Sequence, residues 1–221
     1  MRNHKFVVNE FYHLYSRGVE KRPIFLDSAD HDRFIKLLFH CNGTESVNIR
    51  AIRKGLTFVD FLDERGENLV DIGAYCLMPN HFHLLLKQRQ DLGVSKFMQK
   101  VLTAYTMYFN TRYERSGRLF SSSFKSKHAN EDRYLKYLFA YIHLNPLKIL
   151  NSDWRKLRLY DQERLVNSLS GYDYSSFPDY VEVKRSENLI LNREGFPEYF
   201  PTSLEFIPFI REWIEADIPE V

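Results

Sequence analysis

Two apolar segments joined by a short turn constrain the fold of this chain more than any other feature of its sequence. Residues 69–77, LVDIGAYCL, have the apolar and β-branched character of a buried strand, and residues 81–87 form a second apolar segment. Met78-Pro79-Asn80 lies between them, and its proline interrupts or turns a strand. The sequence therefore predicts two strands of one sheet on either side of a turn.

The second of these strands carries two histidines in a segment otherwise suited to burial. Successive side chains of a strand point to opposite faces, so His81 and His83 share one face, while the other face is apolar (Phe82, Leu84 and Leu86). The Cβ atoms of the two histidines then lie about 6 to 7 Å apart, close enough for both to bind one metal ion. The alternative is a pair of hydrogen-bonded histidines on a solvent-facing side of the sheet. A metal site also needs at least one more ligand.

The other elements follow from the spacing of apolar residues and from turn and capping residues. In chain order we expect a strand at 6–17, a helix capped by Ser28 or Asp30, a hairpin of strands 47–53 and 57–63, a helix from Val94 to about Arg115, a strand or extended loop at 119–125, a helix at 132–144 capped by Asn130, and a helix at 203–216. The simplest assembly of such pieces is a mostly antiparallel sheet with helices packed on one face, which is an α+β fold.

Length and composition indicate one sizeable core with an appended part. The chain has 221 residues, of which 44% are hydrophobic. We expect a domain at residues 1–150 and an irregular or helical C-terminal extension at 151–221, because prolines punctuate the second part and one helix is evident in it. Cys41 and Cys76 cannot form a disulfide framework, and no apolar run reaches the length of a membrane span. We therefore expect a cytoplasmic protein that does not enter a membrane.

A basic, aromatic-rich segment predicts contact with nucleic acid. Tyrosine and phenylalanine residues of segment 93–128 lie among seven basic residues and one acidic residue, Glu114; the basic residues are Lys96, Lys100, Arg112, Arg115, Arg118, Lys125 and Lys127. Cations hold phosphates and aromatic rings stack on bases, so this pattern fits a DNA-binding surface. The alternative is a solvated helix face above aromatic residues of the core.

The helix predicted at 132–144 offers groups that could complete a catalytic site. One face of it carries three tyrosines and, just past its end, an asparagine: Tyr134, Tyr137, Tyr141 and Asn145. An asparagine carbonyl is an acceptable ligand for a hard divalent ion. A phenol is a weak nucleophile unless a nearby ion polarises the phosphate that it attacks. The alternative is a tyrosine-rich face that packs on the sheet, and helical spacing alone leaves all three tyrosines open as nucleophiles.

Several motifs together resemble the HUH endonucleases, in particular the single-tyrosine, IS200-like transposases and the tyrosine transposases associated with repetitive extragenic palindromes (REP). HFH at 81–83 within PNHFHLLL, and YIHLNP at 141–146, match two blocks of that family. Three further segments are similar to family segments in the same order: FYHLYSRGVEKRPIF at 11–25, GRLFSSSFKS at 117–126 and YDYSSFPDY at 172–180. The resemblance runs from about residue 9 to residue 180. Two blocks in the right order are more specific than either one alone.

The resemblance implies a ferredoxin-like fold and a metal-dependent reaction on single-stranded or hairpin DNA. It makes His81 and His83 ligands of Mg²⁺ or Mn²⁺, with Asn145 as a candidate third ligand. It makes Tyr141 the nucleophile that forms a 5′-phosphotyrosine link and leaves a free 3′-OH, which could later rejoin the DNA. The partner would be hairpin DNA, with repetitive palindromic elements as the expected target.

Other interpretations stay open at this point. A protein derived from such an enzyme could bind folded DNA or RNA without cutting it, and a weaker alternative is a hydrolase of small phosphoesters. The active site could form within one chain or between the chains of a homodimer. Ser121-Ser122-Ser123 stands where relatives often carry a basic or polar pair, so this segment departs from the family pattern.

Overall fold

The protein is built on a four-stranded antiparallel sheet. The computed structural model describes residues 5–45, 65–150, 154–158 and 160–216. The strands are β1 (Phe11–Arg17), β2 (Val70–Met78), β3 (His81–Gln88) and β4 (Lys125–His128), in the spatial order β2-β3-β1-β4. α1 (Ser28–His40) follows β1 and α3 (Gly93–Arg112) follows β3, which gives the ferredoxin-like order of elements. The predicted α+β fold with an antiparallel sheet is confirmed.

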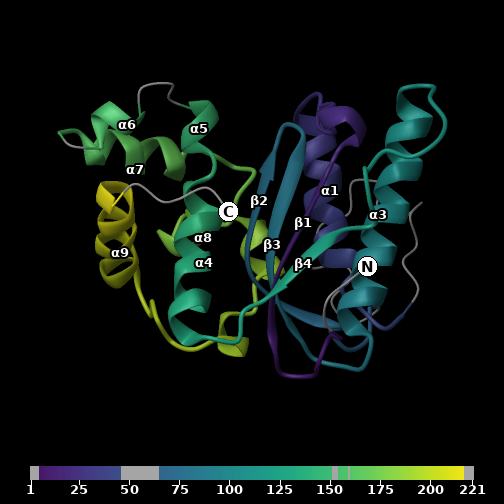
Figure 1. The fold of residues 1–221 in the computed structure, drawn as a ribbon, viewed down its shortest axis with the longest axis horizontal. Helices are drawn as coiled ribbons and strands as arrows, with labels where there is room; N and C mark the ends of the chain where they lie inside the picture. Colours follow the sequence, from purple (N-terminus) through teal and green to yellow (C-terminus); the bar gives the residue numbers. More distant parts are fainter. Residues whose placement is uncertain (1–4, 46–64, 151–153, 159, 217–221) are drawn as a thin grey trace.

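Helices cover both faces of this sheet, not one face as the sequence analysis expected (Figure 1). α1 and α3 pack on the face that carries Phe82, Leu84 and Leu86. α4 (Asp132–Leu144) packs on the opposite face, where it shares a hydrophobic cluster with Leu85 and Cys76. The physical reason is burial: β2 is buried along its whole length and β3 along most of it, so neither strand leaves a polar face for water.

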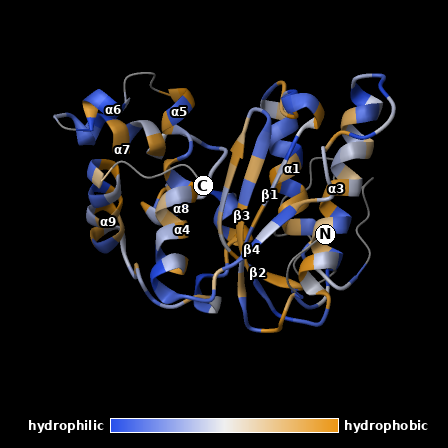
Figure 2. Cartoon of the chain, in the orientation of Figure 1, coloured by the Kyte–Doolittle hydropathy of each residue, from blue (hydrophilic) through white to orange (hydrophobic). Residues whose placement is uncertain are grey.

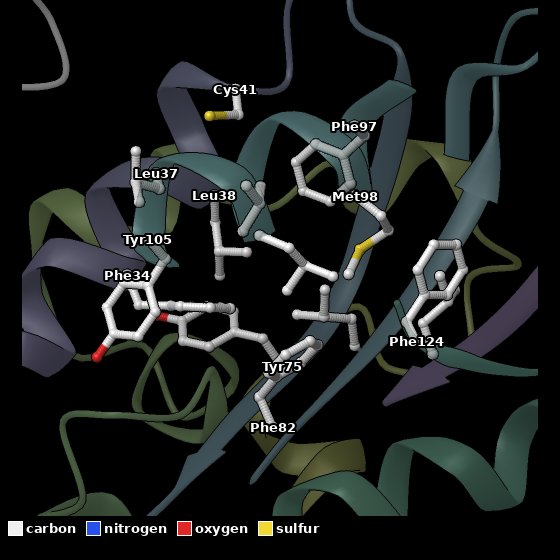
Figure 3. Packing of buried hydrophobic residues seen from close by; sticks show 14 of the residues in the cluster. Phe34, Leu37, Leu38, Cys41, Tyr75, Phe82, Phe97, Met98, Tyr105 and Phe124 are labelled. Atoms are coloured by element: carbon white, nitrogen blue, oxygen red, sulfur yellow. The ribbon is translucent and has the colours of Figure 1, made fainter. Parts of the chain in front are cut away.

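Aromatic packing holds α1 and α3 on their side of the sheet. The ring of Phe34 on α1 lies 5.0 Å from the ring of Phe82 on β3 and 5.0 Å from that of Tyr105 on α3. Figure 3 shows these rings together in the core, with Phe97 and Met98 of α3 beside them. The Tyr105 hydroxyl donates to the Ile24 carbonyl at 2.5 Å, so its buried polar end is satisfied.

The C-terminal part is more helical than expected and packs against α4. The predicted helix at 203–216 is confirmed as α9 (Ser203–Ala216), and four further α-helices precede it: α5 (Leu147–Leu150), α6 (Trp154–Leu157), α7 (Gln162–Ser170) and α8 (Phe177–Tyr180). Short 3-10 helices lie at Val19–Lys21, Ser186–Ile190 and Arg193–Gly195. Figure 2 shows hydrophobic residues on α4, α7 and α9 in this layer. The domain boundary at residue 150 stays a prediction.

Several predicted element ends differ from the observed ones. Asp27, not Ser28 or Asp30, caps α1, because its carboxylate accepts from the Asp30 amide at 3.1 Å. Glu131, not Asn130, precedes α4. β4 begins only at Lys125; before it, Phe120 pairs with Gly18, the residue after β1, through an isolated bridge. The predicted hairpin at 47–63 lies outside the described residues.

Segment 174–176 covers the outer edge of β2. The Ser176 amide donates to the Tyr75 carbonyl, and the Leu77 amide donates to the Tyr174 carbonyl, each at 2.9 Å. His143 of α4 reaches the same segment, with its Nε2 atom 2.7 Å from the Ser176 hydroxyl. The YDYSSFPDY segment therefore ties α4 to the edge of the sheet, and the bond explains why His143 points away from the sheet histidines.

Candidate active site

Tyr141 lies against the two histidines of the sheet face that α4 covers. We call the face that carries His13, His81 and His83 the histidine face. The Tyr141 ring centroid lies 5.4 Å from that of His83 and 5.6 Å from that of His13. The rings of His81 and His83 are 5.0 Å apart, as their spacing on one strand predicts. The structure thus brings the tyrosine of the YIHLNP block to the HFH motif within one chain.

Asn80 determines the proton position on His81. The Oδ1 atom of Asn80 lies 2.6 Å from Nδ1 of His81, and its Nδ2 atom donates to the Lys21 carbonyl at 3.1 Å. The second bond orients the amide, so its carbonyl oxygen is the atom that faces the imidazole. Since a carbonyl only accepts, Nδ1 of His81 carries the proton and Nε2 keeps a lone pair. His81 is therefore in the tautomer that can bind a metal through Nε2.

His13 of β1 is a third imidazole at the site, and the sequence analysis did not place it there. Its Nε2 atom lies 2.9 Å from Nδ1 of His83, and the two rings stack with centroids 5.1 Å apart. β1 and β3 are neighbours in the sheet, with Tyr15 opposite His83, and this pairing brings His13 close. The YHLY alternation of β1 could have shown that His13 and Tyr15 share a face. Only strand pairing shows that this is the histidine face.

The imidazoles of this face are held in their neutral form. Burial, followed by the charges of Arg17 and Lys148, lowers the pKa of His81 to about 4. Burial, followed by the neighbouring His13, lowers the pKa of His83 well below its ordinary value. Burial and Lys127 lower the pKa of His13 to about 3. Neutral imidazole is the form that binds metals.

The other tyrosines of α4 lie farther along the helix from the histidines. Tyr137 contacts the rings of Tyr134, Tyr141 and Trp213, the last at 5.0 Å. Burial, followed by Tyr141 and Tyr134, raises the pKa of Tyr137 to about 12, which makes its phenolate harder to form. Tyr141 is in ring contact with His83 and His13, and Tyr137 lies one helical turn farther along α4.

Asn145 lies one turn after Tyr141, as its spacing predicts. It is buried, and its Nδ2 atom donates to the Tyr141 carbonyl at 2.7 Å. This bond leaves the Oδ1 atom as the group that could bind a metal. Across the described ranges, the hydrogen bonds do not connect Asn145 to either histidine of β3. Its role as a metal ligand stays a prediction.

The seven predicted DNA-binding cations fall into two groups. Lys96, Lys100, Arg112, Arg115 and Arg118 lie on α3 or the loop after it, on the other side of the sheet from the histidine face. Arg112 forms ion pairs with Asp27 and Asp30 at 2.5 and 2.7 Å, and Lys100 donates to the Gly43 carbonyl. These two side chains connect parts of the fold.

Lys125 and Lys127 form the second group. They lie opposite Tyr15 and His13 in the pair of β1 and β4. Because cross-strand partners in an antiparallel pair share a face, both lysines lie on the histidine face. Arg17, opposite His81 on β1, joins them there, and the charge of Lys148 on α5 acts on both His81 and His83. Arg17 and Lys148 were not predicted from the sequence. Both stand in or next to the family motifs, but only their placement beside His81 distinguishes them from other exposed cations.

The chemistry of the histidine face fits a divalent metal in part. His81 and His83 are neutral and share one face, and Nδ1 of His13 is buried without a partner among the described residues. An unsatisfied buried polar atom is uncommon and marks a place that can accept a further group. Within the described part of the chain, no group of three or more His, Cys, Asp or Glu side chains is arranged to hold a metal ion. A third ligand would therefore have to be of another type, such as the Asn145 amide.

Comparison with known proteins agrees with this geometry. A family model described as "Transposase IS200 like" matches residues 61–145, a stretch that contains both histidines of β3 and Tyr141 and ends at Asn145. This part of the chain is similar to the IS200-like transposase family. The resemblance predicted from the HFH and YIHLNP motifs is thus confirmed. The residues that match the family model begin before β2 and do not include β1, which supplies His13.

Among solved structures, the chain is similar to the "Structure of the REP associates tyrosine transposase bound to a REP hairpin". The TM-score is 0.52 at 12% sequence identity, over 85% of this chain and 89% of that chain. At this identity the likeness shows a shared fold. No curated protein matches the chain. In the part that the structure describes, no helix is both long and apolar enough to cross a membrane.

Proposed function

We propose that this IS200-like chain cleaves and rejoins single-stranded or hairpin DNA, with Tyr141 as the nucleophile. The observation that carries the proposal is the contact of Tyr141 with His83 and His13 on a face whose imidazoles are neutral. The family of residues 61–145 supports the same reaction class.

The proposed reaction exchanges one ester bond for another. The Tyr141 oxygen attacks the phosphorus of a phosphodiester and loses its proton. The bond to the 3′-oxygen breaks, and that oxygen takes up a proton as the free 3′-OH. The product is a 5′-phosphotyrosine link, which keeps the energy of the cleaved bond. Attack by a 3′-OH reverses the step and rejoins the DNA without ATP.

His81 and His83 would hold the metal, with Mg²⁺ or Mn²⁺ as the expected ion and Asn145 as a candidate third ligand. Such an ion polarises a phosphate and neutralises charge that develops on it. Asn80 holds His81 in the required tautomer. His13 does the same for His83 if its Nε2 accepts the proton of His83 Nδ1, which leaves the far nitrogen of His83 for the metal. His13 and Asn80 are thus proposed as positioning residues.

We propose that the active site forms within one chain. Tyr141 and His83 of the same chain are already in ring contact, so a partner chain is not needed to bring them together. Segment 174–176 also occupies the β2 edge, where another strand would otherwise add. The homodimer of the sequence analysis stays a prediction.

The expected substrate is hairpin DNA that lies along the histidine face. Arg17, Lys125, Lys127 and Lys148 are exposed there and could hold phosphates. Tyr15 lies between them and the site and could stack on a base. The structurally similar transposase is bound to a REP hairpin, which favours repetitive palindromic DNA as the target. Contacts by Lys96, Lys100, Arg112, Arg115 and Arg118 stay predictions.

A covalent-adduct assay tests the nucleophile. The protein is incubated with end-labelled hairpin DNA and Mg²⁺ or Mn²⁺, then run on a denaturing gel. Wild type and Tyr137→Phe should give a DNA–protein adduct, and Tyr141→Phe should give none, because it removes only the attacking oxygen. Tyr137→Phe is the matched control, since it makes the same change one turn away on the same face.

The same gel separates the alternatives. Loss of the adduct in His81→Ala and His83→Ala, with hairpin binding retained, would support the metal pair. An adduct that survives Tyr141→Phe would assign the nucleophile to another residue, Tyr137 first. Tight hairpin binding without any wild-type adduct would favour the non-cleaving DNA-binding protein. Turnover of small phosphoesters without an adduct would favour a hydrolase.

A further inference from the structure

A cavity of about 400 Å³ lies between α4 and the chain that precedes α9. Phe139 of α4 and Tyr180 of α8 line one part of it, and residues of segment 193–201 line the rest. The Tyr199 hydroxyl donates to the carboxylate of Asp132, the first residue of α4. The chain before α9 therefore passes the start of α4, and the cavity lies where the two meet (Figure 1).

This cavity lies toward the end of the sheet that is remote from His81. The ring of Phe196, one of its lining residues, is 5.2 Å from the ring of Phe11 on β1. Phe11 pairs with Lys87, near the far end of β3. Between Lys87 and His81 the strand extends for about 20 Å, at about 3.3 Å per residue. The proposed reaction on DNA does not use this cavity.

The lining combines aromatic rings with carboxylates. Two carboxylates, those of Glu194 and Glu198, belong to exposed residues. Neither has a hydrogen bond or an ion pair with another described residue. Phe196 and Phe200 are each only 8% exposed, so they form the inner part of the cavity. The aromatic residues of the lining are Phe139, Tyr180, Phe196, Tyr199 and Phe200.

Cations of the chain itself already lie on rings of this cluster. The guanidinium of Arg193 is 4.1 Å from the centroid of the Tyr180 ring, and it donates to a backbone carbonyl of α8. The ammonium of Lys136 is 5.7 Å from the centroid of the Tyr199 ring, and Lys136 is not a lining residue. The faces of aromatic rings attract cations. These contacts show that the geometry around the cavity permits such an attraction.

The lining matches a cation better than other classes of ligand. Glu194 and Glu198 repel an anion, which excludes the phosphates of DNA, and they contribute nothing to the binding of an apolar group. A cation gains from the rings and from both carboxylates. The planar guanidinium of arginine can stack on a ring while its N–H groups bond a carboxylate. An arginine side chain is therefore the ligand group that uses the most of this lining.

The charge of the surrounding chain favours a polypeptide as the source of this arginine. From Asp161 to Val221 the sequence has 13 acidic and 5 basic residues, a net charge of −8. Such an excess attracts a partner with several positive charges and raises its rate of association. A small organic cation would use the cavity alone. A basic segment of a protein would use both the cavity and the acidic surroundings.

We propose that this cavity binds an arginine side chain from a basic segment of a partner protein. The guanidinium stacks on the aromatic lining and pairs with Glu194 or Glu198. Because the cavity is remote from His81, the partner and the DNA can be bound at the same time. The C-terminal part would then attach the DNA-processing face to another protein.

Peptide binding to the full chain, without DNA, tests this proposal. The probe is a fluorescein-labelled peptide of glycine and serine with one central arginine and a lysine on either side. The matched peptide carries citrulline, which has nearly the shape of arginine but no charge. Fluorescence anisotropy should show that the arginine peptide binds about tenfold more tightly. In NMR spectra, the δ protons of the bound arginine should shift upfield, because they lie over aromatic rings.

Matched substitutions locate the binding site. Glu194→Gln/Glu198→Gln removes two charges from the cavity, and Glu212→Gln/Glu215→Gln removes two from the exposed surface of α9. The cavity variant should bind the arginine peptide about tenfold more weakly and the citrulline peptide almost as wild type does. The α9 variant should weaken both peptides by the same small factor.

Equal affinity of wild type for the two peptides would overturn the proposal. So would equal losses of arginine-peptide affinity in the two double variants, because binding would then depend on net charge alone. An arginine preference without the upfield shift would also overturn it, since the guanidinium would not lie on the rings. None of these measurements involves DNA cleavage, so their outcome is independent of the proposed reaction.

Discussion

At the scale of single residues, the proton positions at the histidine face matter more than the number of histidines. Two histidines at alternate positions of β3 are useful to a metal only if each presents a lone pair to the same side. Asn80 enforces this for His81, because its own amide is oriented by the Lys21 carbonyl. The turn Met78-Pro79-Asn80 thus reverses the chain and also fixes the tautomer of His81 through Asn80.

Replacement of Asn80 tests this role. Asn80→Ala removes the acceptor for His81 Nδ1, so we expect the affinity for Mn²⁺ to fall by about 10- to 100-fold, the usual effect of losing such a partner. Asn80→Asp keeps an acceptor at the same position and should retain most of the affinity. Calorimetric titration with Mn²⁺ measures both variants. An affinity in Asn80→Ala equal to wild type would mean that His81 does not need Asn80 or does not bind the metal.

At the scale of elements, the C-terminal part packs closely against an irregularity in β2. β2 has a register shift between Ile72 and Ala74, and Gly73 stands at that irregularity. A Cβ atom on Gly73 would lie 2.6 Å from the ring of Phe196, so this position has no room for a side chain. The Tyr180 hydroxyl donates to the Gly73 carbonyl at 2.7 Å. The bulge of β2 and the C-terminal segment therefore fit one another.

Gly73→Ala should destabilise the fold by about 1 to 3 kcal/mol, the usual cost of overpacking a core. Urea unfolding measures the change in the free energy of unfolding. Gly171→Ala is the control, since its nearest neighbours would lie 3.7 Å or more from the new Cβ. Adding Phe196→Leu to Gly73→Ala should recover part of the loss. An unchanged stability in Gly73→Ala would show that Phe196 moves away at little cost.

At the scale of the whole molecule, several histidines are buried in the neutral form on both sides of the sheet. Burial lowers the pKa of His143 to about 3 and, together with Arg65 and Arg33, that of His40 to about 4, from an ordinary value of 6.5. Between these values and 6.5 the unfolded chain binds more protons than the folded chain. The contribution of these histidines to the free energy of unfolding is therefore fully present above about pH 6.5. It falls as the pH drops toward their pKa values in the folded protein.

Urea unfolding at pH 7.5, 6 and 5 checks this dependence, with a chelator present so that metal binding does not contribute. Each such histidine can contribute a slope of up to about 1.4 kcal/mol per pH unit below its unfolded pKa. His143→Gln should show a shallower slope than wild type, because one of these groups is gone. A stability that stays constant or rises from pH 7.5 to pH 5 would contradict the neutral burial of His143.

Local patterns in the sequence were enough for β1, β2, β3, α1, α3, α4 and α9 and for the core of the candidate site, but not for the short helices α5 to α8. The alternation in β3 placed His81 and His83 on one face, and helical spacing placed Tyr141 and Asn145 on another. Both are short-range consequences of backbone geometry, so they do not depend on the rest of the fold. The family motifs then selected Tyr141 among three tyrosines, and the ring contacts agree with that choice.

Tertiary structure alone decided which surfaces meet. Pairing of β1 with β3 brought His13 and Arg17 to the site, and both are far from the HFH motif in the chain. The same long-range packing placed helices on both faces of the sheet and tied Arg112 to Asp27 and Asp30. The spacing of charges in the sequence could not show these ion pairs of Arg112. A sequence shows the charge of each side chain, but not which distant side chain it contacts. Local geometry is encoded residue by residue, whereas contacts between distant segments depend on how all the buried surfaces are satisfied together.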